Sequence, residues 1–281
     1  MSGLAKWAAV GAVIALLGRA GVAEPPLSEL ATSAADLLRA VVINELNQHP
    51  GHERWMYVVD REQDGRRQRK EVVQTQNGSL ERLLAVDGHS LSPQQQQEET
   101  DRIKKLSGDP QELKNVEDSH RKDRELGETL LKMIPDALLF SYAGHWGEFI
   151  KLTFKPNPNY QPSSREARVI HAMEGEILVQ ASQKRLASIH GHLMEDVKFG
   201  GGLLGHLEKG GRFSAERTEI SPGRWMLTAM EIDMKGKALF VKSISVQQKQ
   251  YRGDFRKLPD DLTPKAAAEM LVGYILLAAR R

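Results

Sequence analysis

Apolar and polar residues alternate on both sides of a Lys-Gly step in the stretch Arg224-Trp-Met-Leu-Thr-Ala-Met-Glu-Ile-Asp-Met-Lys-Gly-Lys-Ala-Leu-Phe-Val241. A two-residue turn at Lys235-Gly236 predicts an antiparallel hairpin that places Met234 opposite Lys237. One face of this hairpin then carries the apolar side chains of Met226, Met230, Ile232, Met234, Leu239 and Val241. The other face is also partly apolar, so we expect the sheet to cover a helix or a ligand.

Strand-like runs continue outward from this hairpin toward the N-terminus and on to Tyr251. They cover Arg54 to Asp60, Arg67 to Gln76, Ser79 to Val86, Trp146 to Lys155, Arg168 to Gln180, Arg185 to Phe199, Gly211 to Ile220 and Lys237 to Tyr251. Asx-Gly steps separate the first three runs and favour tight hairpins, which predicts a three-stranded meander. The short spacing of the later runs is typical of an antiparallel sheet.

Helical patterns occur at both ends of the chain and in one internal segment. Ser28 can cap a helix in which Leu37, Leu38 and Val41 recur at helical spacing, and Thr263-Pro264 can begin a terminal helix. Between residues 92 and 135, Ser92-Pro93 and Asp109-Pro110 predict the starts of two helices, the second of them long. This segment is charged and has a narrow apolar stripe, so we interpret it as an insertion with a solvated face.

The first 23 residues predict a secretory signal peptide, because Lys6 precedes an apolar run from Trp7 to Leu17 and a small-x-small ending precedes Glu24. That run is shorter than the roughly 18 to 20 apolar residues that a membrane span needs. We therefore expect cleavage near Ala23 and export to the periplasm or beyond. Residues 24–281 would form one domain without a transmembrane segment.

Composition excludes several classes of function. The chain has 39 Lys and Arg against 37 Asp and Glu, and two of the cations, Lys6 and Arg19, lie in the predicted signal peptide. The remaining 37 against 37 predicts no nucleic-acid partner. The absence of cysteine excludes disulfides and thiolate chemistry.

A family resemblance accompanies the succession Gly175-Glu-Ile-Leu-Val179, Arg185-Leu-Ala-Ser-Ile189, Gly191-His-Leu193, Gly211-Arg-Phe213, Pro222-Gly-Arg-Trp225 and Gly236-Lys-Ala-Leu-Phe240. This succession resembles the strands of the LolA-like outer-membrane lipoprotein-sorting proteins over about Arg168 to Tyr251. The resemblance implies an α+β fold, in which an unclosed antiparallel half-barrel holds N-terminal, inserted and C-terminal helices in its mouth. It also implies a cavity for acyl chains. The charged insertion departs from the compact carriers.

The expected function is therefore that of a non-enzymatic carrier or sensor of the cell envelope. Its ligand would be a lipid, a lipidated protein or another apolar molecule, and no cofactor is expected. The methionine-rich face fits such a ligand, because unbranched thioethers adapt to chains of variable shape. The candidate cavity residues are Met226, Met230, Ile232, Met234, Leu239, Val241, Leu203 and Leu204.

Two other classes of function stay open. In one, the interior is fully packed and the helices of residues 92–135 bind an envelope protein. In the other, His190 and His192, which share a strand face, bind a metal for a hydrolase, with Asp196 as a further candidate ligand. No third ligand stands at a recognisable spacing, so a polar strand face explains the histidines more simply.

The glycines of Phe199 to Phe213 match G-x-G-x-x-G at Gly200, Gly202 and Gly205. A dinucleotide site needs a helix of several turns after this motif, and Gly210-Gly211 leaves room for a single turn at most. A phosphate-binding P-loop fails because His206 and Leu207 replace its Lys and Ser or Thr. The stretch is therefore interpreted as a sharp crossing between antiparallel strands.

Overall fold

The computed structural model describes residues 32–47, 53–76, 78–202, 204–238 and 242–278, and the chain divides into two compact units. Unit 1 contains Met1–Gln48 and Glu128–Gln250, and unit 2 contains His49–Gly127 and Tyr251–Arg281. The predicted signal peptide and the candidate cavity residues Leu203, Leu239 and Val241 lie outside the described residues.

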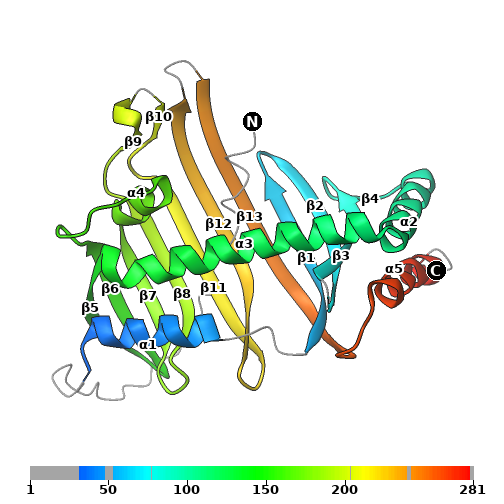
Figure 1. Ribbon diagram of the computed structural model, residues 1–281, viewed down its shortest axis with the longest axis horizontal. Helices are drawn as coiled ribbons and strands as arrows, with labels where there is room; N and C mark the ends of the chain where they lie inside the picture. The colour runs from blue at the N-terminus through cyan, green and yellow to red at the C-terminus, as the bar shows by residue number, and fades with distance from the viewer. Residues whose placement is uncertain (1–31, 48–52, 77, 203, 239–241, 279–281) are drawn as a thin grey trace. The chain divides into compact units, whose positions relative to one another are not determined.

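The elements of each unit are labelled in Figure 1. Those of unit 1 are α1 (Ala34–Asn47), β5 (Leu138–Trp146), β6 (Phe149–Pro156), α4 (Arg165–His171), β7 (Met173–Gln180), β8 (Arg185–Leu193), β9 (Val197–Phe199), β10 (Gly205–Leu207), β11 (Arg212–Ser221) and β12 (Arg224–Ala238). Those of unit 2 are β1 (Arg54–Gln63), β2 (Arg66–Thr75), β3 (Gly78–Val86), β4 (His89–Ser90), α2 (Pro93–Gly108) and α5 (Pro264–Ala278). Two elements have residues in both units, namely α3 (Pro110–Ala137) and β13 (Lys242–Leu258).

The strands follow the order β4-β3-β2-β1-β13-β12-β11-β8-β7-β6-β5, and β9 and β10 extend the sheet beside β12. Successive strands pair in antiparallel fashion, as in β6 with β7 and β11 with β12. In the part of the chain that the structure describes, the terminal strands β4 and β5 do not pair with each other. Among the described residues, the fold is thus α+β with five α-helices and an open antiparallel sheet of 13 strands. The predictions of an α+β class and of an unclosed antiparallel sheet are confirmed.

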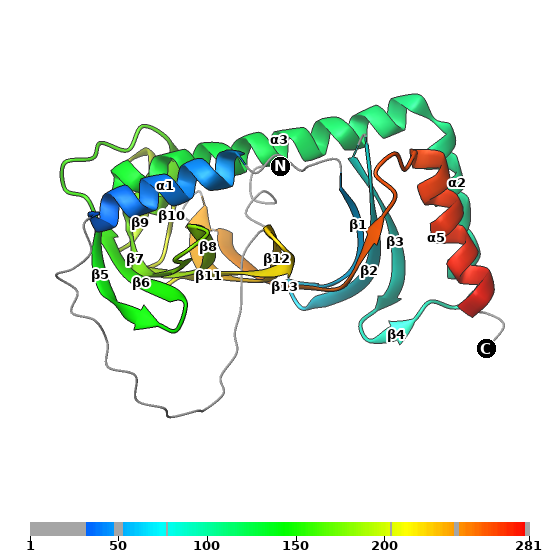
Figure 2. The same ribbon diagram turned by 90° about the horizontal axis from the view of Figure 1, so that it is seen from below.

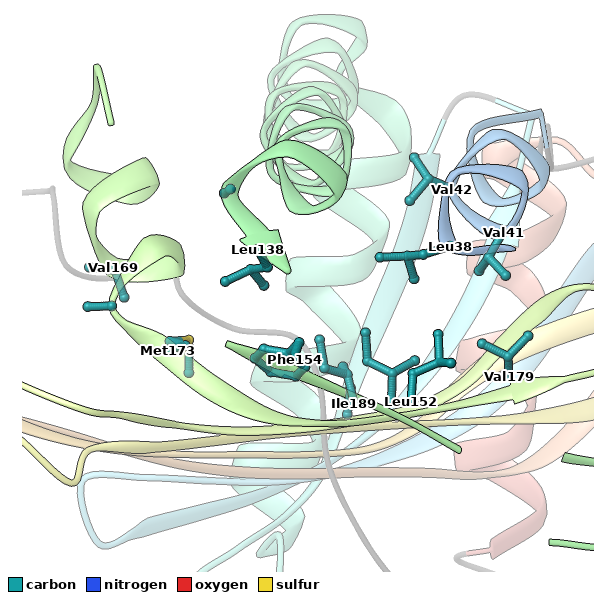
Figure 3. Packing of buried hydrophobic residues seen from close by; sticks show 14 of the residues in the cluster. Leu38, Val41, Val42, Leu138, Leu152, Phe154, Val169, Met173, Val179 and Ile189 are labelled. Atoms are coloured by element: carbon teal, nitrogen blue, oxygen red, sulfur yellow. The ribbon is translucent and has the colours of Figure 1, made fainter. Parts of the chain in front are cut away.

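The core of unit 1 lies between one face of its strands and the helices. Figure 3 shows Leu38 and Val41 of α1 above Leu152, Val179 and Ile189 of the sheet. The end of α3 also covers this face of the sheet, because Leu131 and Ile134 are partly buried against the same cluster. We call this side of the unit 1 sheet the helix-covered face, and its opposite side the polar face.

The core of unit 2 is separate. Its sheet residues Met56, Val73 and Leu80 pack against Ile103 of α2 and Leu271 of α5. Helices α2 and α5 lie side by side against this sheet (Figure 2). Of the apolar stripe predicted for the charged segment, Ile103, Leu106 and Leu113 pack in the core of unit 2, and Leu131 packs against the core of unit 1.

Several sequence signals mark the observed element ends. Asp64-Gly65 has positive φ at both residues, as tight hairpins require. Ser92 caps α2 in a reciprocal capping box with Gln95. Before α5, the Thr263 hydroxyl accepts a hydrogen bond from the Ala266 N–H at 3.2 Å. These starts of helices and turns are confirmed.

The predicted turn at Lys235-Gly236 is wrong, because β12 continues through both residues to Ala238. Gly236 lies opposite Leu207 of β10, and a Cβ atom at Gly236 would overlap the carbonyl oxygen of His206. The lack of a side chain at Gly236 therefore allows β10 to lie close to β12. Its φ lies outside the positive range that hairpin glycines adopt.

The predicted grouping of apolar residues in β12 is wrong for Met226. Consecutive residues of β11 pair with Ala229 and Leu227, so Thr228 is an extra residue in β12. Such a β-bulge shifts the alternation of side chains by one position. Met226 therefore lies on the polar face, whereas Met230 lies on the helix-covered face.

Three predicted strands are broken in the structure. The run from Arg185 to Phe199 divides into β8, which ends at Leu193, and β9, which begins at Val197. The run from Arg168 to Gln180 begins with α4, which Ser164 caps by accepting a hydrogen bond from the Ala167 N–H at 3.0 Å. The run beginning at Trp146 contains the β5–β6 turn at Gly147, whose φ is 58°. Apolar residues recur on both sides of each of these breaks. The apolar pattern alone therefore predicted strands that were too long.

Candidate functional site

The methionine-rich part of β12 lies in the interior of unit 1. Met230, Ile232 and Met234 are buried in the same cluster as the α1 residues Leu38 and Val41. Three of the eight residues predicted to line a cavity thus pack in the same core cluster as side chains of the protein's own helix α1. In this closed arrangement, a ligand on the helix-covered face has to take the place of helix side chains.

A polar cluster fastens the end of α1 to the strands. Glu45 has a side chain only 6% exposed, and its carboxylate forms ion pairs with Arg217 and, at 3.7 Å, with Arg185. The same carboxylate accepts a hydrogen bond from the Leu186 N–H at 3.0 Å. Arg185 also donates to the Asn44 carbonyl at 2.6 Å. The C-terminal turn of α1 is therefore held to β8 and β11 by charge-assisted hydrogen bonds.

A hollow of about 370 Å³ opens at the other end of α1, where α1 and the end of α3 meet β5. Its walls are formed by Ala35, Arg39, Pro135, Asp136, Leu138, Leu139, Phe140, Asn157, Asn159 and Tyr160. Leu138 belongs to the buried core cluster, and Phe140 and Tyr160 pack against that cluster. The hollow, which we call the seam hollow, therefore adjoins the apolar interior of unit 1.

A larger hollow of about 1000 Å³ lies on the sheet of unit 1 and collects side chains of the polar face. Strand register brings these side chains into two rows across the sheet. One row contains Ser141, Thr153, Glu176, His190, Ser214 and Glu231, and the other contains Leu139, Lys155, Glu174, His192, Arg212 and Asp233. The sequence predicted a polar strand face at His190 and His192, but no local signal showed that six strands would form one hollow.

Ion pairs fill much of the polar face. His192 lies 3.0 Å from Glu174, Lys151 lies 2.6 Å from Glu176, and a third pair joins Arg212 to Asp233 at 3.9 Å. His190 stands 3.9 Å from Glu216. Basic side chains of one strand thus face carboxylates of a neighbouring strand, and such exposed pairs each contribute little stability.

The two histidines of the sequence prediction do share the polar face. Within the described ranges, however, no group of three or more His, Asp or Glu side chains is placed to hold a metal ion. Asp196 instead accepts a hydrogen bond from the Lys209 N–H at 2.8 Å. The geometry therefore gives His190 and His192 carboxylate partners without assembling a metal site.

The remaining predicted residues lie away from both hollows. Met226 is buried on the polar face, and Leu204 is 51% exposed at the glycine-rich turn after β9. That turn bends through positive φ at Gly200, Gly201 and Gly202 and leads into the short strand β10. No helix of several turns follows, so the turn lacks the geometry of a dinucleotide site.

Unit 2 carries a buried ion pair of its own. Glu71 lies 3.0 Å from Arg82, whose guanidinium also donates to the Leu271 carbonyl at 2.8 Å. Burial raises the pKa of Glu71, and the nearby Arg82 charge opposes that rise. These groups join β2, β3 and α5, and we interpret them as structural.

Glu99 of α2 behaves differently, because its carboxylate accepts hydrogen bonds from the Leu83 N–H and from Arg102, each at 2.7 Å. Burial acts to raise the pKa of Glu99, but the hydrogen bonds from Arg102 and Leu83 outweigh it and hold this pKa below its ordinary value. The ionised carboxylate therefore stabilises the contact between α2 and β3.

Comparisons with known proteins add little to this geometry. No protein-family model matches the sequence, and no curated protein sequence matches it. Among solved structures, the chain is similar to the crystal structure of a DUF1329 family protein from Desulfovibrio piger. That match has a TM-score of 0.28 and 9% identity, and it covers 80% of this chain and 93% of that chain. Among the described helices, none is long and apolar enough to cross a membrane.

Proposed function

We propose that the protein is an exported, non-enzymatic binding protein that takes an acyl chain or a similar apolar ligand on the helix-covered face of unit 1. The proposal follows the resemblance to LolA-like carriers, in which helices close an open sheet over an acyl-chain cavity. The signal-like leader is in keeping with a role in the cell envelope.

The observation that carries the proposal is the position of the seam hollow. It lies where α1 and the end of α3 meet β5, and its wall includes the core residue Leu138 and Phe140, which packs against the core. An apolar chain that enters there reaches the core cluster as soon as α1 moves outward. The cluster contains Met173, Met230 and Met234, whose flexible thioethers repack readily around a chain.

The closed arrangement also fits a carrier that releases its ligand. Burial of apolar surface contributes about 25 cal/mol per Å² in either case, whether a helix or an acyl chain covers the sheet. The free-energy difference between the loaded and the closed protein is then smaller than the burial energy of either. Ligand exchange by displacement of α1 is consistent with this balance.

Mass spectrometry of organic extracts tests the proposal on the natively purified full chain. We expect one acyl-containing molecule per protein, and binding of a fluorescent fatty acid to the delipidated protein. Phe140→Gln, which places an amide in the seam hollow, should weaken that binding. Trp146→Gln, a matched aromatic change at the far end of β5, where the side chain is 64% exposed, should not. Absence of lipid together with absence of fatty-acid binding would refute the proposal.

A further inference from the structure

Basic side chains line up where β9, β10 and β12 pair at one end of the unit 1 sheet. His206 of β10 lies opposite Lys198 of β9 on one side and opposite Lys237 of β12 on the other. Residues directly opposite in an antiparallel pair point to the same face, with Cβ atoms about 4.5 to 5.5 Å apart. Lys235 lies two residues before Lys237 and therefore shares its face. We call Lys198, His206, Lys235 and Lys237 the basic row.

Carboxylates lie close in sequence to the basic row, since Glu208 follows β10 and Glu195 and Asp196 precede β9, but among the described residues none of them forms an ion pair with its lysines. The lysine side chains are exposed, and none of the three ammonium groups takes part in an ion pair with another described residue. Elsewhere on the polar face, Lys151 pairs with Glu176 and Lys249 pairs with Glu231. Three exposed lysines without an ion-pair partner among the described residues therefore lie together at the β9–β10 end, although the whole chain carries a net charge of only +2.

The backbone fixes this arrangement. The glycine at 236 lets β10 approach β12 closely, and the N–H of Glu208 donates to the carbonyl oxygen of Lys235 at 2.8 Å. Like charges on neighbouring strands weaken strand pairing. An external anion that binds the row relieves this repulsion.

The residue types point to a broad anionic surface as the partner. The row contains lysines and no arginine, and lysine acts as a flexible point charge, whereas arginine fits one phosphate through two parallel hydrogen bonds. Neither of the two hollows includes a residue of the row. The only ring in the row on which a nucleic-acid base could stack is the imidazole of His206.

We propose that the basic row docks the protein on an anionic phospholipid bilayer. Lysines near such a surface each strengthen binding about fivefold, which corresponds to about 1 kcal/mol. Salt screens this attraction, because the Debye length falls from about 10 Å at 0.1 M to about 3 Å at 1 M ionic strength. The proposal does not rest on the apolar ligand site, since the two use different residues and opposite faces of β12.

Co-sedimentation of the full chain with vesicles tests this docking. The vesicles are made of phosphatidylcholine alone or of phosphatidylcholine with 30% phosphatidylglycerol, with salt from low to high. Binding should require phosphatidylglycerol and decline as salt increases. A triple variant Lys198→Gln, Lys235→Gln, Lys237→Gln should bind about a hundredfold more weakly, from three fivefold losses. The matched control Lys104→Gln, Lys105→Gln, Lys114→Gln removes the same charge from exposed positions of α2 and α3 and should bind like the wild type.

Three results would overturn the proposal. Equal binding of the basic-row variant and the wild type would show that the row is not the contact. Equal loss in the control variant would show that only total charge matters. Binding of single-stranded DNA as tightly as the anionic vesicles, at the same salt, would assign the row to nucleic acid. Circular dichroism of each variant checks that the fold is retained.

Discussion

The anchor of α1 offers a prediction that joins stability to ligand binding. Glu45→Gln removes the charge that two largely buried guanidinium groups share, since the side chains of Arg185 and Arg217 are 18% and 17% exposed. Removing one partner of a buried ion pair costs about 3 to 5 kcal/mol. Both arginines are partly solvated and keep hydrogen bonds to backbone carbonyls, at Asn44 and Trp225, so the lower end applies. We expect a loss of about 3 kcal/mol in the docking of α1.

This loss should favour ligand binding if the ligand replaces α1. A free-energy change of 1.4 kcal/mol alters a population ratio tenfold, so about 3 kcal/mol raises the share of the open form by up to about a hundredfold. The apparent affinity for a fluorescent fatty acid should rise by the same factor until the open form predominates. Fluorescence titration measures the affinity, and urea unfolding measures the stability.

The control is Glu71→Gln, which breaks the buried pair with Arg82 in unit 2. It should lower the stability of unit 2 and leave the affinity for fatty acid unchanged. A Glu45→Gln variant that loses stability without gaining affinity for fatty acid would contradict the replacement of α1 by the ligand. An equal gain in affinity for the Glu71→Gln variant would also contradict it, because general loosening of the protein would then explain both results.

Three further outcomes are expected. Glu99→Gln should cost about 1 to 3 kcal/mol at pH 7, because a lowered pKa adds stability above the ordinary glutamate pKa of about 4.3. This stability is lost as the pH falls through the folded-state pKa, so the difference between variant and wild type in urea unfolding should shrink as the pH is lowered, and a difference that grows in acid would contradict it. Leu38→Ala should destabilise unit 1 by about 2 to 5 kcal/mol in thermal unfolding, and a loss below 1 kcal/mol would contradict its buried position. Gly236→Ala should increase hydrogen exchange in β10, through the clash with His206, and unchanged protection would contradict the close approach.

Local sequence rules predicted much of the fold. Capping residues such as Ser92 and Thr263 mark observed helix starts, and the Asx-Gly step at Asp64 marks an observed hairpin. These signals work because the responsible atoms lie within a few residues of one another. Alternation likewise placed Met230 and Ile232 on one face.

Features that depend on distant pairing were not predictable. The bulge at Thr228, which moves Met226 to the polar face, exists only relative to β11. Gly236 resembles a turn residue until β10 is placed beside it. The Glu45 cluster joins α1 to strands more than a hundred residues away, and no spacing rule reports such a contact.

The most direct test of the proposed ligand site is photo-cross-linking with a fatty acid that carries a diazirine at the end of its chain. After irradiation of the loaded full-length protein, peptide mapping should find the label on residues of the helix-covered face, such as Met230, Met234 and Leu152. The label should be absent from residues of the polar face, such as His190 and Glu231. Labelling confined to the polar face, or spread evenly over the surface, would contradict a ligand bound between α1 and the sheet.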